Sequence, residues 1–155
     1  MQNQKDNVLG ISVGTQLLGM ALKKGESLEE WQVKNFEGAW SKHKLRIICF
    51  CVSKYIQDHF VKTVILKVPE SNRSSPAIEM LINGIKTLCR ELNADVSIYT
   101  ISDLKSYCEA QNKAELMQYV LAHHPELSQV FAKTKKVKKV YYVKIFEAVL
   151  ATMLP

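Results

Sequence analysis

Two short apolar runs joined by a Gly-Thr turn open the chain, and they constrain its fold more than any other feature. Residues 8–13 and 17–22 are rich in aliphatic side chains, and Gly14-Thr15 between them is typical of a tight turn. Residues 31–36 predict a third strand after the turn at Gly25-Glu26. Because these strands follow one another so closely, they predict an antiparallel meander at the start of the fold.

Helices and strands alternate after this meander. Ser41 and Ser75-Pro76 are residue types that begin helices, and each precedes an apolar stripe at helical spacing. The predicted helices cover 41–60, 76–93, 102–107, 112–124 and 137–153, and the two further predicted strands cover 63–68 and 96–101. The order β-β-β-α-β-α-β-α predicts an α/β fold in which helices flank a mixed five-stranded sheet.

The composition predicts one domain over residues 8–155, after a polar tail at residues 1–7. The hydrophobic fraction is 47%, which is enough for a core, but no apolar run is long enough to cross a membrane. The tail lacks the apolar segment of a signal peptide, so we expect a cytoplasmic location. We interpret the four cysteines as small buried side chains in a reducing compartment: Cys49, Cys51, Cys89 and Cys108.

The opening run VLGISVGTQLLGMALKK, at residues 8–24, resembles the first hairpin of the RuvC/YqgF branch of the RNase H-like superfamily, which includes Holliday junction resolvases. In that family the first strand reads I-D-x-G-T, and its aspartate holds a catalytic divalent metal. The resemblance implies an RNase H-like fold over nearly the whole chain. It also implies a nuclease site in which four acidic residues hold two metal ions around a phosphodiester.

The four acidic positions of the family fall on residues that carry no carboxylate here: Ser12, Lys67, Tyr141 and Lys144. A hydroxyl is a poor ligand for Mg²⁺, and an ammonium group has no acceptor to offer a metal. We therefore expect neither a catalytic metal nor another cofactor. The ammonium groups of Lys67 and Lys144 are expected to fill the metal space, paired with Glu147 or Glu70, and direct contact with a phosphate is the alternative.

Five lysines within seven residues form the strongest charge feature of a chain whose net charge is +6: Lys133, Lys135, Lys136, Lys138 and Lys139. Such a run binds phosphates with little sequence preference, although a solvated loop is the simpler interpretation. Tyr142, like Tyr141, follows the run and is a candidate for stacking on bases. Arg73 lies in the loop after the fourth strand, and the resemblance places this loop at the rim of the site.

The favoured hypothesis is a catalytically inactive RuvC-like protein that binds nucleic acid, DNA in preference to RNA and branched or structured DNA above all. The resemblance makes a homodimer plausible. Two alternatives stay open, and with them the question of whether the protein is an enzyme. One is an active Mg²⁺-dependent endonuclease with Glu70, Asp103 and Glu147 as unusual ligands. The other is a protein-interaction module on a nuclease scaffold.

Overall fold

A five-stranded mixed sheet forms the centre of the computed structural model, which describes residues 7–134 and 139–155. The spatial order is β3-β2-β1-β4-β5. β1 is antiparallel to β2, and β2 to β3, whereas β4 is parallel to both β1 and β5. The strands are β1 (Asn7–Ser12), β2 (Leu17–Lys24), β3 (Ser27–Asn35), β4 (Val61–Val68) and β5 (Asp95–Thr100). The predicted mixed sheet, with its opening meander, is confirmed.

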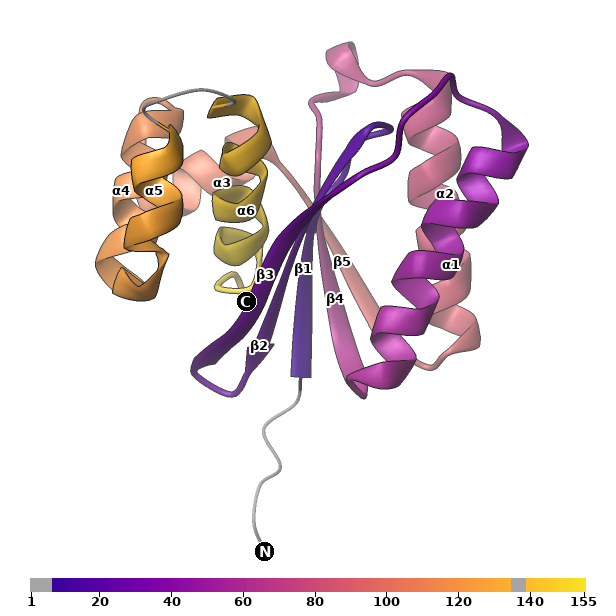
Figure 1. Ribbon diagram of the computed structural model, residues 1–155, viewed down its shortest axis with the longest axis horizontal. Coiled ribbons are helices and arrows are strands. Elements are labelled where there is room, and N and C mark those ends of the chain that lie inside the picture. Colours follow the sequence, from indigo (N-terminus) through magenta and orange to yellow (C-terminus); the bar gives the residue numbers. More distant parts are fainter. Residues whose placement is uncertain (1–6, 135–138) are drawn as a thin grey trace, which may run out of the picture.

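Helices cover both faces of this sheet (Figure 1). One layer consists of α1 (Lys42–Asp58) and α2 (Pro76–Glu91). The other consists of α3 (Ile101–Cys108), α4 (Lys113–His123), α5 (Ser128–Thr134) and α6 (Lys139–Ala151). The described part of the chain also contains two short 3₁₀ turns, η1 (Ser71–Arg73) after β4 and η2 (Pro125–Leu127) before α5.

Most element bounds differ from the sequence-based prediction by one or two residues, and three differences have a clear physical reason. β3 begins at Ser27 rather than at residue 31, because its polar first half pairs with β2 across a shift in register. The helix α3 begins one residue earlier than predicted, since Thr100 and Asp103 form a reciprocal capping box there. The helix α5 was not predicted, because seven residues are too few to display a helical period. The predicted start of the last helix, Val137, lies outside the described residues.

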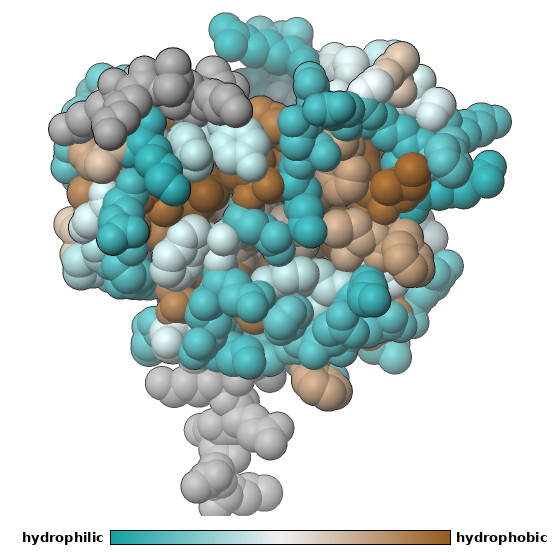
Figure 2. All heavy atoms as spheres, viewed as in Figure 1, coloured by the Kyte–Doolittle hydropathy of each residue, from teal (hydrophilic) through white to brown (hydrophobic). Residues whose placement is uncertain are grey.

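Strand alternation divides the apolar side chains between two cores. Leu9 and Ile11 of β1 join a core that packs against α1 and α2. Gly10 and Ser12 point to the opposite face, where α6 crosses β1 and β2. On the face of the molecule that Figure 2 shows, hydrophilic residues predominate, with apolar groups between them.

Two glycines allow α6 to lie very close to the sheet. A Cβ atom on Gly10 would meet the carbonyl oxygen of Ala148 at 2.1 Å, and one on Gly19 would meet that of Lys144 at 2.3 Å. Neither distance is possible for a real side chain, so these two positions fix how closely α6 packs on β1 and β2. The close packing brings side chains in the middle of α6 within reach of the ends of the strands.

The structure tests two further predictions, that the cysteines are buried and that no segment crosses a membrane. All four cysteines are free thiols, but only Cys89 is buried, because Cys49, Cys51 and Cys108 lie on half-covered flanks of their helices. Burial raises the pKa of the Cys89 thiol to about 11. Over residues 7–134 and 139–155, no helix is both long and apolar enough to cross a membrane.

Candidate functional site

The ends of β1 and β4 present a serine and a lysine side by side to α6. In the parallel ladder Ser12 lies opposite Lys67, and in the antiparallel ladder it lies opposite Gly19. On β4, Val64, Leu66 and Val68 belong to the core under α1 and α2, so alternation directs Lys67 to the other face. The sequence pattern of both strands thus places polar groups beneath α6.

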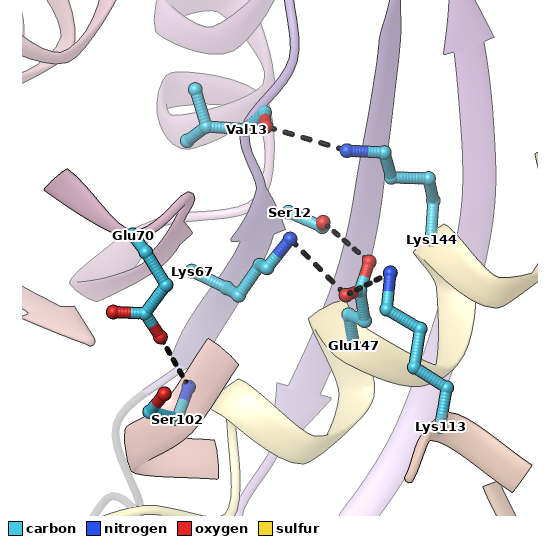
Figure 3. A network of polar contacts seen from close by, with 8 residues as sticks. All are labelled: Ser12, Val13, Lys67, Glu70, Ser102, Lys113, Lys144 and Glu147. Carbon is cyan, nitrogen blue, oxygen red and sulfur yellow. Dashed lines mark hydrogen bonds and ion pairs between the residues drawn. The ribbon is translucent and has the colours of Figure 1, made fainter. Parts of the chain in front are cut away.

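Glu147 of α6 receives these two groups. Its side chain is 1% exposed. The hydroxyl of Ser12 donates a hydrogen bond of 3.1 Å to Glu147 Oε1, and the ammonium nitrogen of Lys67 lies 3.1 Å from Oε2 (Figure 3). Lys113, the first residue of α4, places its Nζ 3.6 Å from the same oxygen. Oε2 accepts no well-aligned hydrogen bond from the described residues, so the two lysines hold it by charge.

Lys144 lies nearly one helical turn before Glu147 and completes the group. Its Nζ donates a long hydrogen bond of 3.4 Å to the carbonyl oxygen of Val13, just beyond the end of β1. A Cβ atom on Gly14 would lie 3.2 Å from the same Nζ, so the glycine leaves room for the ammonium group. We call these five residues the Glu147 cluster: Ser12, Lys67, Lys113, Lys144 and Glu147.

The electrostatics of the cluster favour the charged form of Glu147 and disfavour the charged form of Lys144. Burial alone would raise the pKa of Glu147, but the ammonium groups of Lys67, Lys113 and Lys144 outweigh it and hold the pKa below its ordinary value. For Lys144, burial and then repulsion by Lys67 lower the pKa from 10.5 to about 8, and the carboxylate of Glu147 offsets only part of this effect. The cluster therefore holds more positive charge than its carboxylate can balance.

This donor set does not fit a divalent metal ion. Mg²⁺ takes oxygen ligands, mainly carboxylates, and an ammonium group has no lone pair to give. The cluster offers one carboxylate, and two ammonium nitrogens already lie against it. Within the described ranges, no three His, Cys, Asp or Glu side chains are placed together where they could hold a metal. The arrangement is suited to attracting an anion.

The acids proposed for an active nuclease are not gathered at one place. Glu70 accepts a hydrogen bond of 2.9 Å from the backbone N–H of Ser102 at the start of α3 (Figure 3). Hydrogen bonding to the side chain of Ser102, and then to its backbone N–H, lowers the pKa of Glu70. Asp103 accepts a hydrogen bond of 2.8 Å from the N–H of Thr100. Both carboxylates therefore cap α3, whereas Glu147 is buried among lysines.

The described residues that were predicted to touch nucleic acid come from three elements, η1, α5 and α6. Arg73 is exposed in η1, and Lys133 is exposed at the end of α5, with its Nζ 5.6 Å from the centre of the Tyr142 ring. Tyr142 is half-buried against the second core, and the hydroxyl of Tyr141 donates to the carbonyl oxygen of Val33 on β3. The hydroxyl of Tyr141 is thus directed to β3 and not to the Glu147 cluster. Lys135, Lys136 and Lys138 lie outside the described residues, and of Lys139 only its place as the first residue of α6 is described.

Sequence reasoning missed Lys113. Asn112 and Glu115 marked the start of α4, and both positions are confirmed as the cap and its partner. No sequence signal shows which element the first residue of that helix faces, because the contact with Glu147 spans two helices distant in sequence.

Among solved structures, the chain is similar to RuvC of Thermus thermophilus. The structure of that protein in complex with a Holliday junction substrate has a TM-score of 0.70 and 14% sequence identity, and the match covers 94% of this chain and 91% of that one. A second structure of the same RuvC has a TM-score of 0.68 and 15% identity, with 93% and 92% covered. No family model and no curated protein matches the sequence. The chain has the RuvC-like form of the RNase H-like fold.

Proposed function

We propose that this protein is a catalytically inactive RuvC-like protein that binds nucleic acid, with branched or structured DNA preferred. The observation that carries the proposal is the Glu147 cluster. In a fold shared with RuvC over 94% of the chain, the buried carboxylate beneath β1 and β4 is paired with ammonium groups. Positive side chains stand where the resemblance leads one to expect carboxylates and metal ions.

The inactivity follows from the chemistry of the donors. A two-metal nuclease stabilises the attacking and leaving oxygens with two cations held by clustered carboxylates. Here Lys67 and Lys144 supply positive charge directly, but an ammonium group cannot ligate and activate a water as a divalent metal does. A phosphodiester can be bound by such a cluster without being cleaved.

The binding surface is expected at the end of the molecule where β1 and β4 finish. η1, with Arg73, lies at this end, as do the end of α5 and the start of α6 (Figure 1). The lysine run at residues 133–139 belongs to this junction between α5 and α6. The proposal includes a cytoplasmic location and a homodimer.

Binding and cleavage are tested in one experiment. Fluorescence anisotropy follows a labelled four-way DNA junction, a plain duplex and a structured RNA across a salt series, with Mg²⁺ and with EDTA, and each end point is run on a denaturing gel. We expect saturable, salt-sensitive binding that is tightest for the junction, with no cleavage. Two paired variants, Lys135→Gln/Lys136→Gln and Lys138→Gln/Lys139→Gln, should each weaken binding and lower the salt dependence.

The matched control is Lys54→Gln/Lys62→Gln, which removes the same charge from two exposed positions, on α1 and at the start of β4. Equal losses in the control would mean that only net charge matters. Metal-dependent cleavage that Glu147→Ala abolishes would establish the nuclease alternative. Absence of saturable binding at physiological salt would favour the protein-interaction alternative.

A further inference from the structure

The Glu147 cluster carries a charge imbalance that the described side chains do not correct. Three ammonium groups, on Lys67, Lys113 and Lys144, act on one carboxylate. The charged groups that act on Lys144 are Lys67 and Lys113, which repel its ammonium group, and Glu147, which attracts it. Unbalanced charge in a partly buried site is costly unless a counter-ion joins it.

Two of the three lysines retain donors for such a counter-ion. Lys67 is buried and lies close against Glu147. Lys144, in contrast, makes one long hydrogen bond to Val13, and each ammonium group has three donors. Lys113 reaches the cluster from the solvent side, since half of its side chain is exposed. Figure 3 shows these two side chains entering from separate elements, Lys144 from α6 and Lys113 from α4.

Gly14 adds no side chain beside Lys144, and the nearby carboxylates of Glu70 and Asp103 are engaged elsewhere. Gly14, in the turn after β1, has no side chain where its neighbour Lys144 places the ammonium group. Glu70 is directed to α3 and Asp103 to its own cap, so neither adds a carboxylate that would repel an anion at this point. A tetrahedral oxyanion can meet two ammonium groups at once, and lysine is a common point-charge partner of phosphate.

We propose that Lys113 and Lys144 form a phosphate-binding site, occupied by a single backbone phosphate of the bound nucleic acid. The inference rests on the proposed function and adds to it a defined contact point, distinct from the lysine run at residues 133–139. Glu147 is then a positioning residue, which holds Lys67 and Lys113 in place without touching the phosphate.

The test compares Lys113→Gln/Lys144→Met with the control Lys54→Gln/Lys62→Gln, and both remove two positive charges. Binding of the labelled four-way junction is measured across a salt series. Each phosphate contact contributes about 1 to the slope of log K against log salt, so the site variant, which loses its single phosphate, should lose about 1 and the control close to zero. A second arm measures the shift in melting temperature caused by inorganic phosphate and by pyrophosphate, which should raise the melting temperature of the wild type and the control but not of the site variant.

The two arms separate failure of the site from failure of the proposed function. If the wild type binds the junction and the site variant keeps its full salt slope, the phosphate site is refuted while nucleic-acid binding stands. If no nucleic acid binds but phosphate stabilises the wild type through these two lysines, the site serves free phosphate compounds and the proposed function is refuted. If neither arm responds, both proposals fail.

Discussion

Replacing Glu147 by glutamine tests how the cluster is held together. The amide has nearly the shape of the carboxylate and can still accept the hydrogen bond from Ser12. It removes the negative charge that lies 3.1 Å from Lys67, whose side chain is 8% exposed. The variant therefore leaves a buried ammonium group without its partner.

The expected loss is large. Removing one member of a buried ion pair costs about 3–5 kcal/mol, because the remaining charge stays desolvated. Lys144 and Lys113 add repulsion once the carboxylate is gone. Replacing both partners, as in Lys67→Met/Glu147→Gln, should recover most of the loss, since a buried pair exchanged for groups of similar volume is often close to neutral.

Urea unfolding of the wild type, both single variants and the double variant gives this cycle. With a slope of about 2 kcal/mol per molar urea, Glu147→Gln should lower the unfolding midpoint by about 2 M. The exposed Glu91 on α2 is the control, and Glu91→Gln should change stability by less than about 0.5 kcal/mol. Because the pKa of Glu147 is lowered in the folded state, its stabilisation is complete above the ordinary value of 4.5 and is lost as the pH falls through the folded pKa. The gap between wild type and Glu147→Gln should therefore narrow below about pH 4.5.

A stabilising effect of Glu147→Gln would refute this reasoning. Carboxylates clustered for metal binding repel one another, and neutralising one of them relieves that repulsion. A gain in stability would therefore show that Glu147 is not held by the lysines around it, and a change under about 1 kcal/mol would show that the ion pair with Lys67 does not form in solution.

Three further predictions follow from single positions. Lys144→Met should stabilise the protein at pH 7 by up to about 3 kcal/mol, because lowering a lysine pKa from 10.5 to about 8 penalises its charged form. This penalty is complete below pH 8 and disappears as the pH rises towards 10.5. The urea midpoints of the wild type and of Lys144→Met should therefore converge near pH 10.5. Gly19→Ala should destabilise by about 1–3 kcal/mol in the same assay, since its Cβ would lie 2.3 Å from a backbone oxygen of α6. Cys89, whose thiol is buried with a pKa of about 11, should react with a thiol reagent only after unfolding, whereas immediate reaction would contradict its place in the core.

The sequence predicted the sheet and most helices because their signals are local. Ser41, Ser75 and Asn112 cap the helices that they were predicted to begin. The failures share a cause as well. The first half of β3 contains Glu29 and Glu30, which hide an edge strand, and α5 is shorter than two helical turns. Pairing with β2 and packing against α6 decide these segments, and neither is visible in a local pattern.

The site was predictable in part. A partner for the lysines was expected at Glu147 or Glu70, and the structure pairs Lys67 with Glu147 while Glu70 caps α3. Alternation along β1 and β4 could place Ser12 and Lys67 on one face, because strand periodicity is readable from sequence. The contact between Lys113 and Glu147 could not be predicted from the sequence, since it depends on how α4 packs against α6.

Lys144 shows why the cluster is better explained by binding than by stability. A helix residue packed over β2 with a weakly bonded ammonium group does not need its charge for folding, and an apolar side chain of similar length would avoid the desolvation. The lowered pKa of Lys144 means that the folded chain bears a cost for keeping this charge at neutral pH. Residues that weaken a fold in this way are characteristic of functional sites, where a ligand compensates the cost. An anion placed between Lys113 and Lys144 would do so, which is why Lys144→Met, which removes one of the two proposed phosphate contacts, is also expected to gain stability.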